Sequence, residues 1–363
     1  FKWQGYYKGN CCTSKTGQFC CKMKKLLIII IVLIVLFIGY SITVTPSYKT
    51  LDITHAIDKA KATLKANQEI VVFDSKNPFN FYDVFHRMDE ISNQKVFGIL
   101  TKPDNIGVFP IIIGVAGSAG WAEHHYGYLE RYLEMGFAVF SLHSFKSRGV
   151  ESTVGKQLTV TIPMMILDAF SALKELSEDE NIDVNRAGLT GWSLGGGVTL
   201  FTAWSPIQEA ISPNLKFAAH LPFYPPCMII PDELRFTNAP LHILAGEIDD
   251  WVPAAACEEL VEAANISGYD IGITVYPGAS HSFDRSMDVV LDNDAYSFTD
   301  CRMKLSNDGV VSLLNGFPLS SPSLQKIGLA FCADKGAHWG GNKYARERSS
   351  AFAIEFMKNH LMD

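Results

Sequence analysis

The stretch Gly191-Trp192-Ser193-Leu194-Gly195, followed by Gly196 and Gly197, decides the fold. Before it, Ala187–Thr190 is small and apolar and predicts a short buried strand; after it, Val198–Trp204 predicts a helix packed on a sheet. A serine in G-x-S-x-G between a strand and a helix is the nucleophile-elbow pattern, in which a sharp turn exposes the hydroxyl above the sheet. Glycines are needed there because a Cβ would clash in so tight a turn. A glycine-rich turn with an incidental serine remains the alternative while the motif stands alone.

Length and composition allow a large buried core and exclude one class of partner. The chain has 363 residues, of which 48% are hydrophobic, enough for one large domain or two small ones. The net charge is −7, and no basic run lies outside the first residues. Nucleic acid is therefore not an expected partner.

The N-terminal part carries a targeting pattern. Met23 is the first methionine, and Lys24 and Lys25 precede an apolar run that begins at Leu26. This pattern predicts a signal peptide or a membrane anchor over residues 23–46, and the run just reaches a spanning length if it extends from Leu26 to Val44. The lysines on its N-terminal side predict that the remainder lies outside the cytoplasm, whether periplasmic, secreted or membrane-anchored.

Residues 1–22 form an N-terminal extension without a globular pattern. Its cysteines resemble a paired metal clamp but lack an accompanying histidine, so no metal site is expected; they are Cys11, Cys12, Cys20 and Cys21.

Residues 47–363 alternate apolar runs with helical patterns. The expected strands are 70–73, 96–100, 109–115, 137–142, 187–190, 217–221, 240–245 and 272–276, and the expected helices are 53–68, 123–135, 159–178, 198–204 and 344–361. This alternation predicts one α/β domain with a mostly parallel central sheet and helices on both faces. Residues 285–321 lack a clear pattern and are interpreted as an insertion that covers a pocket.

Three chemically suited residues each follow an expected strand. Ser193, Asp249 and His281 occur in that order, which is the α/β-hydrolase order, and all fall at the carboxyl edge of the sheet. A serine hydroxyl needs a base to become a nucleophile, imidazole is suited to that role at neutral pH, and a carboxylate orients the imidazole. Asp250 is the alternative carboxylate and His338 the alternative base.

The loop Ala116–Gly120 follows the expected strand 109–115 and is built of small residues. Such a loop commonly supplies one oxyanion donor, here the backbone N–H of Ser118, while the N–H of Leu194 supplies the other. Ala119 and Trp192 adjoin these positions and are candidate substrate contacts. An ordinary strand-to-helix loop is the alternative.

The chain resembles the dienelactone hydrolase family of α/β-hydrolases from about Val96 to the C-terminus. The resemblance is carried by four motifs: Gly191-Trp192-Ser193-Leu194-Gly195-Gly196, Phe223-Tyr224-Pro225-Pro226-Cys227, Gly246-Glu247-Ile248-Asp249-Asp250-Trp251-Val252-Pro253 and His281-Ser282-Phe283. It implies an α/β-hydrolase fold and a serine hydrolase of small-molecule esters, acting through Ser193, Asp249 and His281 without a metal or organic cofactor. The enzymes that give the family its name carry cysteine where this chain has Ser193. The elbow also resembles that of cutinase-like polyester hydrolases.

A second loop of the family differs here. Relatives often have Asp-Ser-Phe-x-x-Arg-Gly after the fourth strand, whereas this chain has His143-Ser144-Phe145-Lys146-Ser147-Arg148-Gly149. His143 and Arg148 are therefore possible substrate contacts, with a structural loop as the other interpretation.

Rival functions share the same residues. A serine peptidase, an acyltransferase and a binding protein that has lost activity all remain open. In an exported domain, Cys227 would pair with Cys257, because both follow adjacent strands, and Cys301 with Cys332; free buried thiols are the alternative.

Overall fold

The computed structural model describes residues 15–43 and 50–362. The chain divides into two units, Phe1–Thr45 and Pro46–Asp363. The first contains the helix α1, Lys15–Thr43. Among the helices of the described residues, none is both long and apolar enough to cross a bilayer. The anchor predicted over Leu26–Val44 ends at a residue that lies outside the described range, as do Cys11 and Cys12 of the extension.

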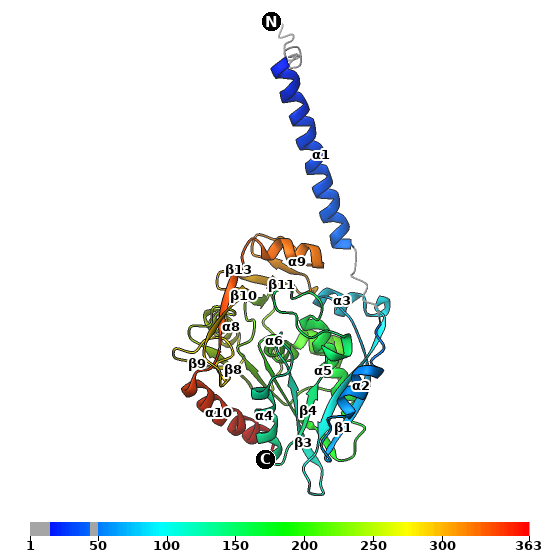
Figure 1. Cartoon of the computed structure of the whole chain (residues 1–363), viewed down its shortest axis with the longest axis vertical. Coiled ribbons are helices and arrows are strands. Elements are labelled where there is room, and N and C mark those ends of the chain that lie inside the picture. The colour runs from blue at the N-terminus through cyan, green and yellow to red at the C-terminus, as the bar shows by residue number, and fades with distance from the viewer. Residues whose placement is uncertain (1–14, 44–49, 363) are drawn as a thin grey trace. The chain divides into compact units, whose positions relative to one another are not determined.

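The second unit is built on an eight-stranded sheet with the order β1-β2-β4-β3-β5-β6-β8-β9 (Figure 1). Its strands are β1 Gln68–Lys76, β2 Asn93–Thr101, β3 Phe109–Val115, β4 Ala138–Leu142, β5 Ile182–Trp192, β6 Ala219–Phe223, β8 Leu241–Gly246 and β9 Ile271–Tyr276. All neighbours from β4 to β9 pair in parallel, while β1 with β2 and β2 with β4 pair antiparallel. The mostly parallel sheet predicted from the sequence is confirmed.

The central strand shows why the pattern predicts the sheet so well. Every residue of β3 is buried, and its core is the run Ile111, Ile112 and Ile113. β-Branched side chains fit a pleated surface, and a strand covered on both faces needs apolar residues at every position. The strand predicted over 109–115 has these bounds in the structure.

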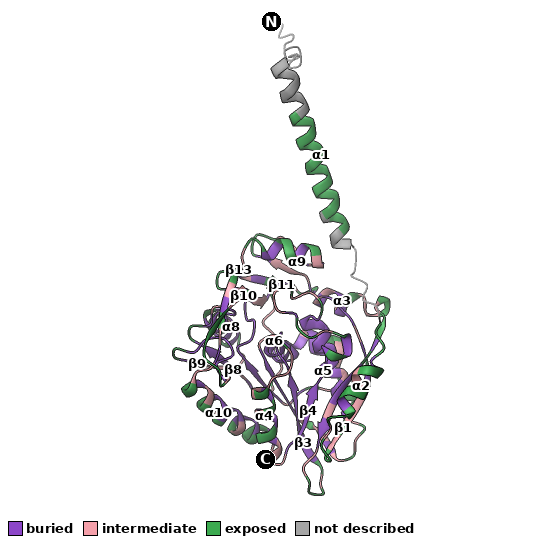
Figure 2. Cartoon of the chain, in the orientation of Figure 1, coloured by how far each residue is buried: buried purple, intermediate pink, exposed green. Residues whose placement is uncertain are grey.

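Helices cover both faces of the sheet. A Cβ built on Gly188 of β5 would meet Met357 and Leu361 of α10, Lys343–Leu361, and one on Gly191 would meet the first turn of α6, Leu194–Thr202. Successive residues of a strand point to opposite faces, and Gly188 and Gly191 are three residues apart. The two helices therefore lie on opposite faces of the sheet. α4, Glu123–Glu134, contacts α10, and α5, Ile162–Leu176, contacts α6. The buried sheet between partly exposed helices is visible in Figure 2.

The remaining helices complete the layers. They are α2 Thr54–Lys61 against β1, α3 Phe81–His86, α7 Ser205–Ile211 and α8 Ala254–Ile266 against β8 and β9, with short 3₁₀ turns at Met88–Glu90 and Lys146–Arg148. The helix predicted over 53–68 is shorter than expected: it ends at Lys61, turns follow, and Gln68 already belongs to β1, which pairs with β2.

Residues 285–339, called the cap below, are the region that sequence pattern described least well. They contain β10 Val290–Ser297, β11 Met303–Leu305, β12 Val311–Leu313, α9 Pro322–Leu329 and β13 Asp334–Trp339. β10 pairs with β13, and β12-β11-β7 form a second small sheet with β7, Ile229–Pro231. Figure 1 shows these elements gathered at one end of the second unit. β11 and β12 have three residues each, too few to show a hydrophobic period, and in β10 only Ala295 is buried, so 285–321 looked patternless.

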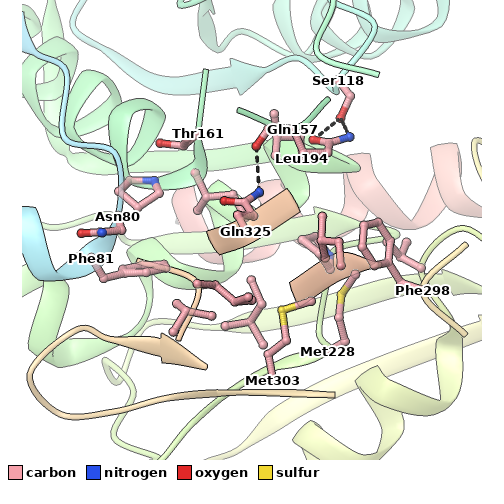
Figure 3. A pocket seen from close by; sticks show the side chains of 18 of the residues that line it. Asn80, Phe81, Ser118, Gln157, Thr161, Leu194, Met228, Phe298, Met303 and Gln325 are labelled. Atoms are coloured by element: carbon pink, nitrogen blue, oxygen red, sulfur yellow. Dashed lines mark hydrogen bonds between the residues drawn. The ribbon is translucent and has the colours of Figure 1, made fainter. Parts of the chain in front are cut away.

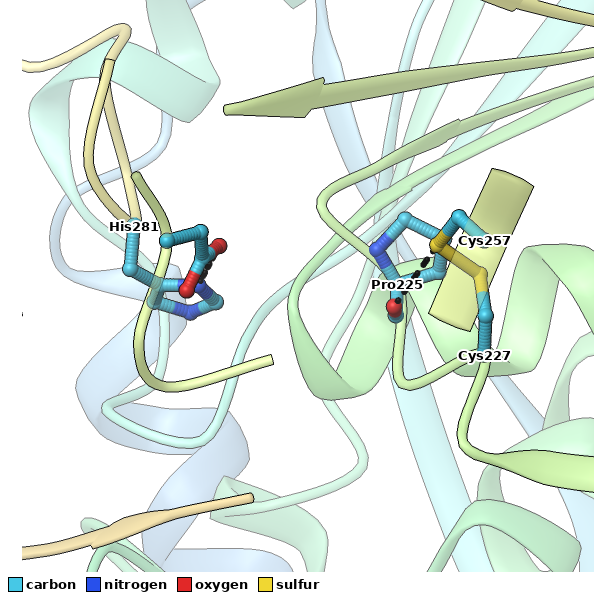
Figure 4. The surroundings of a disulfide bond; sticks show 5 residues. Pro225, Cys227, Cys257 and His281 are labelled. Carbon is cyan, nitrogen blue, oxygen red and sulfur yellow. Dashed lines mark hydrogen bonds and ion pairs between the residues drawn. A yellow bond between two sulfur atoms is a disulfide. The ribbon is translucent and has the colours of Figure 1, made fainter. Parts of the chain in front are cut away.

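Two disulfides hold the loops around this end. Cys227 is bonded to Cys257, which joins the loop after β6 to α8, as Figure 4 shows. Cys301 is bonded to Cys332 within the cap. Both predicted pairings are confirmed.

Candidate active site

Ser193 has a backbone conformation that ordinary residues avoid. Its φ of 56° and ψ of −114° place it between the end of β5 and the start of α6. A Cβ on Gly191 would lie 2.2 Å from the carbonyl oxygen of Gly195, and one on Gly195 would lie 2.1 Å from that of Val115. Glycine is therefore required on both sides of the serine, and the strained turn directs the hydroxyl away from the core.

A continuous hydrogen-bond chain begins at this hydroxyl. The Oγ of Ser193 lies 2.9 Å from Nε2 of His281, and Nδ1 of His281 lies 2.7 Å from Oδ2 of Asp249. An ionised carboxylate only accepts hydrogen bonds, so Nδ1–H donates to Asp249. In the neutral ring Nε2 is then the acceptor, and the serine hydroxyl donates to it. The ring is oriented to take the serine proton.

Neighbouring groups hold both partners of the serine in place. The other oxygen of Asp249 accepts from the backbone amides of Trp251 and Val252, each at 2.9 Å. The aromatic rings of Trp251 and Tyr224 lie 4.9 and 4.7 Å from the ring of His281, centroid to centroid. Since His281 is only 1% exposed, its imidazole has little freedom to turn away from Ser193.

The alternative residues form a separate pair. Asp250 accepts from the backbone N–H and from Nδ1–H of His338, both at 2.7 Å, and His338 is an exposed residue of β13. The structure thus brings Asp249 and His281 to Ser193, and it places Asp250 and His338 together at the surface. The pair links the cap to the loop after β8, and the N–H of Gly340 donates to the carbonyl oxygen of His281 at 2.9 Å.

Two backbone amides near Ser193 are the candidate oxyanion donors. A Cβ on Gly117 would lie 2.9 Å from the carbonyl oxygen of Trp192, so glycine allows the loop after β3 to approach the elbow and brings Ser118 beside Leu194. Among the hydrogen bonds of the described residues, neither the N–H of Ser118 nor that of Leu194 has a protein acceptor. Free amides at the start of a helix and in an adjoining loop suit a developing oxyanion.

Ser193 lines two cavities. The larger, of about 140 Å³, is shown in Figure 3 and reaches Ser193, Leu194 and Ser118. The smaller, of about 50 Å³, contains Ser193, His281 and Ser118. The larger cavity is lined in part by the region interpreted as an insertion, through residues 298, 303, 311 and 319, so the expectation that this region covers a pocket is confirmed.

Among the described residues, no cluster of three or more His, Cys, Asp or Glu is arranged to hold a metal ion.

The four candidate contacts separate into two groups. Trp192 and Ala119 line the smaller cavity. His143 and Arg148 line neither cavity. The ring of His143 stacks on Phe97 with centroids 5.2 Å apart, and burial lowers its pKa to about 3.

Arg148 has a buried structural partner that the sequence did not reveal. Its guanidinium binds both carboxylate oxygens of Asp168, at 2.6 and 2.9 Å, and its remaining N–H groups donate to Asn77, Ser144 and Lys76. The structural-loop interpretation of His143–Gly149 is therefore the one that fits. Asp168 lies inside the apolar helix α5, where no motif marked it.

Sequence reasoning also missed residues that border the site. Tyr224 donates from its hydroxyl to Oδ1 of Asp284 at 2.8 Å, and burial together with that carboxylate raises the pKa of Tyr224. The guanidinium of Arg285 lies 4.5 Å from the ring centroid of Trp339, and both residues line the smaller cavity. The backbone of Tyr224 has a positive φ of 36°, a feature that the local sequence does not reveal.

Comparison with known proteins places the chain in a family. The family model described as "Dienelactone hydrolase family" matches residues 97–308, more than half of the chain. A protein of Methylorubrum extorquens assigned provisionally as a carboxymethylenebutenolidase is 24% identical over 191 residues, which are 50% of this chain and 65% of that protein. A second protein with the same provisional assignment, from Synechocystis, is 23% identical over 208 residues, 53% of this chain and 82% of that protein.

A solved structure supports the fold. A dienelactone hydrolase-like promiscuous phosphotriesterase from metagenomic libraries has a TM-score of 0.50 at 13% identity, covering 81% of this chain and 99% of that one. At this identity the likeness concerns the fold alone. From the extent of the family match, the chain belongs to the dienelactone hydrolase family.

Proposed function

We propose that the protein is a serine hydrolase that cleaves carboxylic esters through an acyl-enzyme. The observation that carries the proposal is the chain of hydrogen bonds from Ser193 through His281 to Asp249, at 2.9 and 2.7 Å, beside two unengaged backbone amides. A nucleophile, a base, a residue that orients the base and an oxyanion site are the parts that acyl transfer needs. Membership of the dienelactone hydrolase family supports the same reaction class.

The proposed reaction has two halves. In the first, Oγ of Ser193 bonds to the ester carbonyl carbon while its proton passes to Nε2 of His281. The amides of Leu194 and Ser118 bind the resulting oxyanion. When the C–O bond to the alcohol breaks, the proton passes from His281 to the alcohol oxygen. In the second half, water attacks the carbonyl carbon of the acyl-enzyme while His281 takes its proton. When the bond to Oγ of Ser193 breaks, the proton passes from His281 to that oxygen, and the acid leaves.

The test compares matched variants of the two Asp–His pairs. We expect Ser193→Ala to abolish hydrolysis of p-nitrophenyl butyrate and labelling by a fluorophosphonate probe, without loss of fold. Asp249→Asn removes the acceptor that fixes the tautomer of His281, and it should lower kcat by about 10³- to 10⁴-fold. Asp250→Asn, the control at the neighbouring position, should change kcat less than about fivefold, because its partner His338 does not reach the serine.

The opposite results would reject the proposal. Ester turnover that survives Ser193→Ala would remove the serine from the reaction. A folded wild-type protein that neither turns over esters nor accepts the fluorophosphonate label would favour a binding protein that has lost activity.

The same proposal includes a location outside the cytoplasm. It is supported by the two disulfides, which form in oxidising compartments, and by Lys24 and Lys25 ahead of an apolar run.

A further inference from the structure

We propose that the larger cavity binds the acyl part of the ester and the smaller cavity the alcohol part, so that the preferred substrates are esters of an unbranched apolar acid with about six carbon atoms. This inference rests on the proposed function, and it names the substrate class of the same site.

The position of His281 assigns the two cavities. The departing alcohol oxygen has to receive a proton from Nε2 of His281, so the alcohol must leave on the side where this ring lies. His281 lines the smaller cavity and not the larger one. Leu194, whose amide is a proposed oxyanion donor, lines only the larger cavity. The remaining substituent of the tetrahedral carbon, which is the acyl chain, is thereby directed into the larger cavity.

The lining of the larger cavity suits a hydrocarbon chain. No charged side chain is among the residues that line it, and most are apolar; these include Phe81, Ile162, Met228, Phe298, Met303 and Leu319. Figure 3 shows Met228, Phe298 and Met303 on the side of the cavity opposite Ser118 and Gln157. A chain without polar groups is therefore favoured over one that carries a charge.

Two polar side chains of this lining, Asn80 and Gln325, donate hydrogen bonds to the protein. The side-chain amide of Gln325 donates to the carbonyl oxygen of Gln157 at 3.0 Å. The side-chain amide of Asn80 donates to the carbonyl oxygen of Ser320 at 2.9 Å. Because these N–H groups donate within the chain, they do not require an acceptor on the substrate.

The size of the cavity limits the length of the acyl chain. Its volume is about 140 Å³. An apolar protein cavity of about 150 Å³ holds one benzene molecule, which has six carbon atoms. A hexanoyl group matches that capacity, and the additional carbon atoms of a longer chain would extend beyond this volume and gain less from burial.

The cap builds the wall that sets this limit. Met303, in β11, is buried and lines the cavity, while the next residue, Lys304, is exposed and does not. Successive residues of a strand point to opposite faces, so the two positions form a matched pair for mutagenesis. Met303 contacts neither the serine nor its partners within hydrogen-bond distance and is not part of the catalytic machinery.

The test uses two isomeric esters, ethyl hexanoate and hexyl acetate, which contain the same atoms and differ only in which side carries the long chain. Each methylene buried in the acyl cavity is expected to raise kcat/KM by up to about fourfold. We therefore expect the wild-type protein to prefer ethyl hexanoate by at least about tenfold. Met303→Trp should lower kcat/KM for ethyl hexanoate by about tenfold or more, and it should lower that for ethyl acetate, whose acyl group has only two carbon atoms, by clearly less. Lys304→Trp, the control, should leave both values unchanged.

Met303→Ala provides a second variant that enlarges the cavity. It should move the preferred acid in an ethyl ester series from hexanoate towards octanoate. The inference is overturned, with the proposed function intact, if hexyl acetate is preferred, if the isomers are equal, or if Met303→Trp lowers the turnover of ethyl acetate and ethyl hexanoate equally. Turnover of p-nitrophenyl butyrate without turnover of either isomer would likewise overturn the inference alone. Absence of any Ser193-dependent turnover of all four esters would overturn the proposed function itself.

Discussion

His220 shows at the scale of one residue how burial without a partner affects stability. The side chain, in β6, is fully buried, and neither ring nitrogen has a hydrogen-bond partner. Burial lowers its pKa to about 3, because the charged imidazolium cannot be solvated there. The unfolded chain, with a pKa near 6.5, takes up a proton as the pH falls while the folded protein does not, so stability decreases below about pH 6.5.

This difference predicts the pH dependence of one variant. Between pH 7 and pH 5, His220 should account for a loss of about 2 kcal/mol in the free energy of unfolding. In His220→Leu that loss should disappear, which urea unfolding at the two pH values would measure. His55 is exposed, so His55→Gln serves as the control. The free energy of unfolding of this variant should decrease between pH 7 and pH 5 by as much as that of the wild type. A loss in His220→Leu equal to that of the wild type would contradict the assignment.

At the scale of elements, Arg148 joins segments that are distant in the chain. Its guanidinium connects Asp168 of α5 to Lys76 of β1, to Asn77 after that strand and to the loop after β4. All of its N–H donors have acceptors, and Ser75 adds a hydrogen bond to Asp168 at 2.6 Å. Removing one partner would leave the other charge buried and unpaired.

We therefore expect Arg148→Met to lower the free energy of unfolding by about 3–5 kcal/mol. The matched change Arg186→Met breaks a half-exposed pair with Asp183 and should cost less than about 1 kcal/mol. Chemical denaturation measures both, and kcat of the folded protein should be unchanged in each. A loss of turnover in Arg148→Met without a loss of stability would instead support the hypothesis that Arg148 contacts substrate.

At the scale of the whole molecule, the two disulfides bear on where the protein matures. We expect Cys227, Cys257, Cys301 and Cys332 to resist alkylation in denaturant until a reductant is added, as peptide mapping of the native-source protein would show. Loops closed over about 30 residues are each stabilised by about 3–4 kcal/mol, so reduction should also lower the Tm. Peptides that are alkylated before reduction would contradict both the pairing and the proposed location outside the cytoplasm.

The strands of the central sheet could be predicted from the sequence, whereas the short strands of the cap could not. Long apolar runs such as Phe109–Val115 predicted the central strands well, because burial on both faces leaves a signal in every residue. β7, β11 and β12 have three residues each, and they are held by pairing with one another rather than by a periodic face. Their location could not be predicted from local sequence.

The candidate site shows the same division. The elbow and the order of Ser193, Asp249 and His281 are local features, since each residue adjoins a strand and its flanking glycine or proline. The choice between Asp249 and Asp250 was open in the sequence. Adjacent residues in a loop can point in different directions, and only the folded chain shows that Asp249 binds His281 while Asp250 binds His338.

The sequence by itself determined the sheet, the elbow and the family resemblance, because these depend on short-range hydrophobic pattern and on turns that only glycine permits. The tertiary structure alone decided which Asp and His meet the serine, that Arg148 is buried against Asp168, and that the cap closes an apolar cavity beside Ser193. The physical reason is that hydrogen-bond geometry and cavity shape depend on residues brought together from distant parts of the chain. The residues adjacent in sequence do not predict those contacts.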